Sequence, residues 1–200
     1  YVIDCVFNCN EMGLKTSNEP SLTLHIRNSE FSRNRQDYPK TGKLSHNIYV
    51  GHIAEFTMEN SISQGAIYGH NVKSRAKKTT LTHNRIFDEG AISSSYLVDI
   101  PNGGLAVIEN NYLFKNKGSR NNAFISYGAE GITHASNEII IRNNHGAAEE
   151  GFIFLLKNHS DLKASFTGNN IKNIVMDEIS GLKKDGFLDR MKHKIRNYIN

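Results

Sequence analysis

A short pattern recurs seven times along this chain and limits the folds that the chain can adopt. In each copy an apolar stretch leads into Asn, or once Asp, and a second polar residue follows. The aligned column consists of Asp4, Asn28, Asn60, Asn84, Asn110, Asn143 and Asn169. Its members are separated by 24, 32, 24, 26, 33 and 26 residues. A period in this range, with insertions of variable length, is typical of a solenoid in which each repeat forms one coil.

Asn is common at these repeats, and its chemistry suits the corners of a solenoid. The chain contains 24 Asn in 200 residues. Asn tolerates the left-handed backbone conformation of tight turns, and stacked Asn side chains can hydrogen-bond from one coil to the next. We therefore expect the aligned column to form a corner of the solenoid.

A second strand-like run follows each corner and alternates with period two. Because a slip of one residue would exchange the two faces, the apolar ladder decides the register. We predict that one set of side chains stacks inside the solenoid: Leu14, Ile48, Val72, Val98 and Ile125. The alternate set stacks outside: Lys15, Tyr49, Lys73, Asp99 and Ser126.

These patterns predict an all-β parallel β-helix of about seven coils over residues 1–175, followed by a helical cap over 176–200. In the cap, Phe187, Met191, Ile195 and Tyr198 recur at steps that place them on one face of a helix. A terminal helix of this kind would cover the open edge of the last coil. Residues 32–45 and 145–150 are predicted insertions, and insertions in solenoids tend to form loops on the binding face.

Charge and composition narrow the function classes only slightly. The formal net charge is +4 and the pI is near 9.0, which favours an anionic partner. No apolar run is long enough to span a membrane, and no signal peptide is visible. Cys5 and Cys9 lack the neighbours of a zinc site, so we expect packed thiols, with a disulfide as the alternative in a secreted protein.

The Asn-cornered coils resemble right-handed parallel β-helix proteins of the pectin-lyase-like superfamily, over about residues 1–175. A closer resemblance, to a group of bacterial β-helix proteins, rests on the segments 45–51, 69–76, 99–104 and 125–131. The superfamily holds polysaccharide lyases, hydrolases, esterases, epimerases and inactive adhesins. The resemblance implies a secreted or periplasmic protein that acts on a polysaccharide, although fold alone does not fix function.

Polar side chains of several kinds gather at corresponding places in four successive coils. They are His46, Tyr49, His70, Lys73, Arg75, Asp99, Ser126 and Tyr127. Because parallel strands lie about 4.8 Å apart, four coils would spread this set over roughly 15 Å, enough for several sugar units. We expect an anionic polysaccharide as the partner and no nucleic acid.

Abstraction of a proton beside a uronate carboxylate builds negative charge on that carboxylate, and this chemistry fits four of these residues. Arg75 can stabilise the charge while Lys73, in a positive field that includes His70, takes the proton. Tyr49 can donate a proton to the leaving oxygen. The lyases of the superfamily are similar in using Lys or Arg as base, some of them with calcium.

The remaining candidates would bind substrate. They are His46, Asp99, Ser126 and Tyr127, together with Arg33 and Arg35 in the basic insertion. The alternatives stay open. Lys73 can pair with Asp99 and merely stabilise the stack, as in a non-catalytic carbohydrate-binding or surface structural protein.

Two further alternatives concern acidic residues. Asp99, Asp88, Glu89 and Glu130 would suit a glycoside hydrolase, which needs two carboxyl groups. Asp88, Glu89 and Asp99 are also the only candidates for a calcium site, but we expect a solvated turn there and no cofactor, with calcium as the alternative. The catalytic coils of a larger protein could also precede Tyr1.

Overall fold

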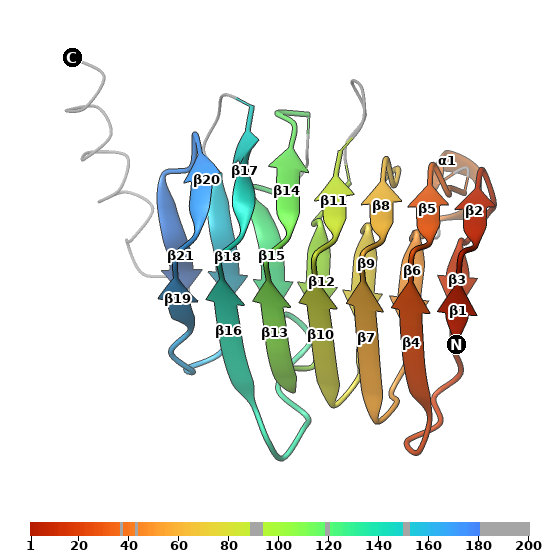
Figure 1. Ribbon diagram of the computed structural model, residues 1–200, viewed down its shortest axis with the longest axis horizontal. Coiled ribbons are helices and arrows are strands. Elements are labelled where there is room, and N and C mark those ends of the chain that lie inside the picture. The colour runs from red at the N-terminus through yellow and green to blue at the C-terminus, as the bar shows by residue number, and fades with distance from the viewer. Residues whose placement is uncertain (37, 43, 89–93, 119–120, 150–152, 181–200) are drawn as a thin grey trace.

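The computed structural model describes residues 1–36, 38–42, 44–88, 94–118, 121–149 and 153–180. Its strands form three parallel sheets of seven strands each (Figure 1). Each coil contributes one strand to each sheet, and the strands of successive coils pair in parallel. The prediction of an all-β parallel solenoid with seven coils is therefore confirmed.

The three sheets take their strands at regular intervals along the chain. Sheet A contains β1 (Val2–Ile3), β4 (Thr23–Arg27), β7 (Glu55–Glu59), β10 (Lys78–Thr82), β13 (Leu105–Glu109), β16 (Glu138–Arg142) and β19 (Ser165–Thr167). Sheet B contains β2 (Val6–Asn8), β5 (Glu30–Ser32), β8 (Ile62–Gln64), β11 (Arg85–Phe87), β14 (Tyr112–Lys115), β17 (His145–Ala148) and β20 (Asn170–Lys172). Sheet C contains β3 (Leu14–Lys15), β6 (Ile48–Val50), β9 (Val72–Ser74), β12 (Val98–Ile100), β15 (Ala123–Tyr127), β18 (Phe154–Asn158) and β21 (Met176–Ser180).

One continuous apolar core runs through the middle of the coils and is shared by the three sheets. In sheet C the inward column is the predicted one, because Ile48, Val72, Val98 and Ile125 pair in register and are buried. Leu14 packs at the end of the same column. The alternation of the sequence therefore gave the correct register for this sheet.

Two adjacent columns of residues form the corner between sheets A and B: one makes the turn and the other makes the hydrogen bonds between coils. Asp4, Asn28, Asn60, His83, Asn110 and Asn143 have positive φ, and Gly168 takes the same place in the last coil. The next residue of each coil forms the hydrogen-bonded ladder: Cys5, Ser29, Ser61, Asn84, Asn111, Asn144 and Asn169.

The aligned column of the sequence analysis is thus out of register at two coils. Asn84 and Asn169 belong to the ladder, and their neighbours His83 and Gly168 make the left-handed turn. The error arose because Asn can serve either role, so its identity alone does not place a coil.

The predicted insertions need a second correction. Residues 145–148 are strand β17, which pairs with β14 and β20, so low strand propensity is overridden by pairing on both sides. The long excursion in this half of the chain lies instead between β15 and β16, over residues 128–137, and we call it the 128–137 strap. The basic insertion after β5 carries one short helix, α1 (Tyr38–Thr41).

The end of the solenoid lies beyond the predicted boundary at residue 175. Met176–Ser180 forms β21, which pairs in parallel with β18 and completes sheet C. The predicted cap residues Phe187, Met191, Ile195 and Tyr198 lie outside the described residues. In the described part of the chain, no helix has the length and apolar character needed to cross a membrane.

Candidate functional site

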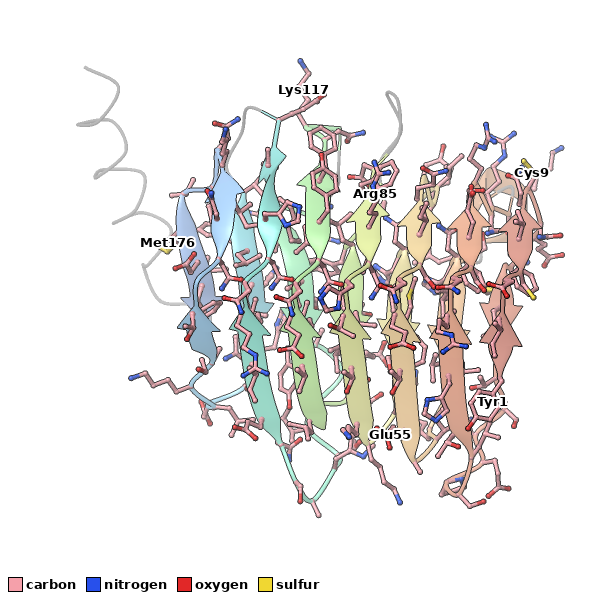
Figure 2. The ribbon with its side chains drawn as sticks, in the orientation of Figure 1. Tyr1, Cys9, Glu55, Arg85, Lys117 and Met176 are labelled. Atoms are coloured by element: carbon pink, nitrogen blue, oxygen red, sulfur yellow. The ribbon has the colours of Figure 1, made fainter. Side chains whose placement is uncertain are left out.

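Most of the predicted site residues lie on or beside the outer side of sheet C. Figure 2 shows Glu55 and Arg85 on sheets A and B, and sheet C lies behind these two sheets in the same view. Lys15, Tyr49, Lys73, Asp99 and Ser126 form one outward column of directly paired residues. The predicted outer set is therefore confirmed, and its members are neighbours from coil to coil.

This outward column is largely covered. Lys73, Asp99 and Ser126 are buried, which is unusual for charged groups on the outer side of a sheet. A neighbouring stack of rings lies beside them: His46 lies 5.0 Å from His70, centroid to centroid, and His70 lies 5.5 Å from the ring of Tyr96. The site is thus a packed charge cluster in which most groups already have partners.

Lys73 lies between two carboxylates. Its Nζ is 3.1 Å from Asp99 Oδ2 and 2.9 Å from Glu130 Oε1. The Lys73 and Asp99 side chains are only 10% and 5% exposed, whereas that of Glu130 is 46% exposed. The pairing of Lys73 with Asp99 that the sequence left open is present, and Glu130 of the 128–137 strap adds a second, accessible partner.

Arg75 is held at three points. Its Nε donates to the Tyr49 hydroxyl at 2.9 Å, and one terminal nitrogen donates to Asn102 Oδ1. The other terminal nitrogen lies 2.7 Å from Glu130 Oε2. The guanidinium also lies over the Tyr49 ring, 5.8 Å from its centroid. Two of these three partners belong to the coils, so they fix Arg75 without help from Glu130.

The two histidines have a defined hydrogen pattern. The backbone N–H of His70 donates to His46 Nδ1 at 2.9 Å, and the backbone N–H of Tyr96 donates to His70 Nδ1 at 3.0 Å. Each neutral ring therefore carries its hydrogen on Nε2, and His70 Nε2 lies 3.4 Å from Asp99 Oδ2. Burial, aided by nearby positive charges, lowers the pKa of His46 and of His70 to about 3.

The pKa values of other ionisable groups in the cluster are shifted as well. Burial disfavours a charged Glu130, but hydrogen bonds from Lys73 and Arg75 outweigh this effect and lower the pKa of its carboxyl group. Burial and the charge of Asp99 raise the pKa of Tyr96 to about 12. Asp99 Oδ1 is buried and has no hydrogen-bond partner among the described residues.

Three predicted binding residues lie elsewhere. Tyr127 points into the core, where its hydroxyl donates to Gly104 O at 2.6 Å. Arg33 and Arg35 are exposed after β5, where their backbone N–H groups bond to Gln64 O and Asn10 O. The cluster on sheet C therefore brings together His46, Tyr49, His70, Lys73, Arg75, Asp99 and Ser126.

The two candidate calcium ligands that the structure describes, Asp88 and Asp99, have different surroundings. Asp88 is buried next to Lys115 at the end of β11, and it accepts hydrogen bonds from Ser94 and the Asn116 backbone. Asp99 lies on sheet C, and Glu89 lies outside the described residues. Among the residues described, no three His, Cys, Asp or Glu side chains form a group suited to a metal ion. Calcium stays a hypothesis.

Sequence reasoning missed the partners that complete the cluster. Asn102 and Tyr96, on either side of β12, contact it, and the sequence indicates Glu130 only as a hydrolase carboxylate. Glu130 is 57 residues from Lys73 in the chain. The signal that could have identified it is the length of the coil that contains the strap, which is one of the two longest steps in the aligned column.

Comparisons with known proteins add no family. No family model, no curated protein and no solved structure matches this chain.

Proposed function

We propose that the chain is a right-handed β-helix of the pectin-lyase-like type that binds an acidic, uronate-containing polysaccharide on the outer side of sheet C. Right-handed crossovers between parallel strands of one sheet are strongly preferred, which supports the handedness. One observation carries the functional proposal. Lys73 and Arg75 together hold the two oxygens of an accessible carboxylate, that of Glu130.

A uronate polymer presents a carboxylate on each sugar unit. One such carboxylate would contact Lys73 and Arg75 as the Glu130 carboxylate does. Arg guanidinium groups hold carboxylates with strong, directional hydrogen bonds. The adjacent coils offer the Tyr49 ring, the Asn102 amide and the exposed Lys15, and strand pairing sets the spacing of Lys15, Tyr49 and Lys73. Localisation outside the bacterial cytoplasm accompanies this proposal.

Cleavage by β-elimination is the catalytic form of the same proposal. Arg75 would stabilise charge on the uronate carboxylate, and the Tyr49 hydroxyl, which accepts from Arg75, keeps its own hydrogen for a leaving oxygen. The base that would remove the proton is the least supported part of this mechanism. The Nδ1 atoms of His46 and His70 accept backbone hydrogen bonds, and the Lys73 ammonium contacts two carboxylates. Recognition therefore has more support than cleavage.

Glycoside hydrolysis has less support. It requires a carboxyl group that is protonated at the working pH, and such groups have raised pKa values. The pKa of Glu130 is instead lowered by its hydrogen bonds to Lys73 and Arg75. Burial raises the pKa of Asp88, but this side chain is fully buried beside Lys115, out of reach of a polymer. Calcium, if it takes part, would act at a site that includes the polymer's own carboxylates.

The test is calorimetric titration of the purified protein with polygalacturonate, alginate and hyaluronan, with and without calcium. A fully methyl-esterified polygalacturonate serves as the neutral control polymer. Arg75→Gln should weaken binding at least tenfold, because a desolvated charged hydrogen bond is lost. Arg142→Gln makes the same charge change on sheet A, where Arg142 pairs with Glu109, and should leave affinity unchanged.

The possible outcomes distinguish a specific binding site, non-specific attraction and catalysis. Equal losses in Arg75→Gln and Arg142→Gln would show non-specific attraction and refute a site on sheet C. No binding to any uronate polymer would refute the proposal as a whole. A rise in ultraviolet absorbance from unsaturated sugar ends, abolished by Arg75→Gln, would establish elimination, whereas binding without a rise would leave a binding module.

A further inference from the structure

Glu130 occupies the place that a ligand carboxylate would take. Its Oε1 lies 2.9 Å from Lys73 Nζ and its Oε2 lies 2.7 Å from Arg75, so each oxygen contacts one cation. This is the geometry of a carboxylate shared by two positive groups. We propose, on the basis of the function proposed above, that the Glu130 side chain is an internal competitor that a uronate carboxylate displaces.

Each cation has a second partner that keeps it in position when Glu130 leaves. Lys73 is also paired with the buried Asp99. Arg75 is also bonded to the Tyr49 hydroxyl and to Asn102. The positive pair is therefore preorganised by the coils, and displacement of Glu130 uncovers a site without dismantling it.

The contacts of Glu130 differ in strength from those of Asp99. The Asp99 side chain is 5% exposed, and removal of a buried ion-pair partner leaves an uncompensated charge. The Glu130 side chain is 46% exposed, and ion pairs open to solvent contribute little. Asp99 is thus the permanent partner of Lys73, and Glu130 is the exchangeable one.

Only the side chain of Glu130 has to move, because the backbone of the 128–137 strap is bonded firmly to the preceding coil. The N–H of Glu130 donates to Pro101 O at 2.9 Å, and the N–H of Thr133 donates to Asn102 O at 3.0 Å. Asn137 Oδ1 accepts from the Gly104 N–H at 2.8 Å. The strap positions one carboxylate over the two cations and leaves that carboxylate half-exposed.

The competitor also sets specificity. A neutral sugar offers nothing that replaces the charge of Glu130, so Glu130 remains on the cations and the neutral polymer is excluded. A polymer with a carboxylate on each unit exchanges one anion for another. The strap therefore selects for acidic units at the position of Lys73 and Arg75.

The test compares Glu130→Gln with wild type by titration with polygalacturonate and with monomeric galacturonate. Glu130→Gln removes the competing charge and keeps the side-chain shape, and affinity should rise roughly two- to tenfold, as expected for release of a solvent-exposed ion pair. The NMR resonance of the Arg75 Nε–H should shift at lower galacturonate concentration in this variant than in wild type.

Two variants serve as controls. Glu109→Gln removes an ion-paired carboxylate on sheet A, opposite Arg142, with the same change in net charge, and should not tighten binding. The double variant Glu130→Gln/Arg75→Gln should lose the gain, because the gain requires the uncovered guanidinium. Thermal unfolding should show that Glu130→Gln stays folded at the binding temperature.

Failure of this inference is distinct from failure of the proposed function. One outcome is that wild type binds polygalacturonate through Arg75 while Glu130→Gln binds equally or more weakly. In that case Glu130 has only a structural role, this inference is wrong, and the proposed function stands. A matching gain in Glu109→Gln assigns the effect to net charge and also overturns the inference. If neither wild type nor Glu130→Gln binds any uronate, both proposals fall.

Discussion

At the scale of single residues, His46 and His70 are buried as neutral rings. Each Nδ1 accepts a backbone hydrogen bond from the next coil, so a ring with hydrogens on both nitrogens would lose that bond. Burial is the main cause of the lowered pKa of both side chains, to about 3. The histidines are therefore hydrogen-bond donors at Nε2 and spacers between coils under neutral conditions.

These histidines should make the fold sensitive to acid. The pKa is about 3 in the folded state, against an ordinary value of 6.5, so the unfolded chain binds protons that the folded chain does not. Stability is then complete above the ordinary value and falls as the pH drops from there towards the folded value. At pH 5 each histidine accounts for a loss of about 2 kcal/mol.

The measurement is urea denaturation of wild type and His70→Asn at pH 7 and at pH 5. Asn can accept the same backbone hydrogen bond without titrating, so the acid-induced loss should shrink by about 2 kcal/mol in this variant. His83→Asn, an exposed histidine at the corner of sheets A and B, is the control and should show the wild-type loss. An unchanged loss in His70→Asn would contradict a buried neutral ring.

At the scale of elements, the ladder between sheets A and B joins neighbouring coils through side-chain amides. Asn111 Oδ1 accepts from the Asn84 backbone N–H, and its Nδ2 donates to Leu81 O and to Asn144 Oδ1. The ladder satisfies backbone groups that the turn leaves without strand partners. In the first coils Ser29 and Ser61 do the same with their hydroxyl oxygens.

Asn111→Ala should therefore be more harmful than Asn111→Ser. The alanine leaves the buried N–H of Asn84 without its Asn111 acceptor and removes the hydrogen bond to Leu81 O, at a cost of about 1–3 kcal/mol. The serine restores the acceptor, as Ser29 and Ser61 show in the same column. Free energies of unfolding from urea titrations check the order. If Ala proves no worse than Ser, the ladder does not contribute in this way.

At the scale of the whole molecule, each coil contacts chiefly the coils next to it. Strand pairing connects β13 with β10 and β16 and with no other strand of sheet A. Stability in such a chain is approximately a sum of coil and nearest-neighbour terms. The effect of damage to one coil should consequently decrease with distance along the stack.

Ile108→Ala is the test, because Ile108 is a fully buried residue of β13. Loss of the side chain should cost about 2–5 kcal/mol. Hydrogen exchange should accelerate most in β10, β13 and β16 and least in β1, at the far end of sheet A. Equal acceleration in all seven strands of that sheet would show that the molecule opens only as one cooperative unit.

Much of the fold could be predicted from the sequence, because the interactions that define a coil are local and repeat. Alternation placed Ile48, Val72 and Val98 inside and Lys73 and Asp99 outside, since the side-chain period of a strand leaves only two choices. The corner at Asn84 was misplaced by one residue, because Asn suits both the turn and the ladder. Strand β17 was missed, because its small residues are held by their neighbours rather than by their own propensity.

The sequence by itself determined the period, the inner and outer columns of sheet C, and therefore the adjacency of Tyr49, Lys73 and Asp99. Only the tertiary structure decided the environment of that column. It brought Glu130 across from the 128–137 strap and used the Nδ1 atoms of His46 and His70 to receive backbone hydrogens. The physical reason is that strand alternation is a local property of the backbone, whereas burial and charge pairing depend on segments that are far apart in the chain.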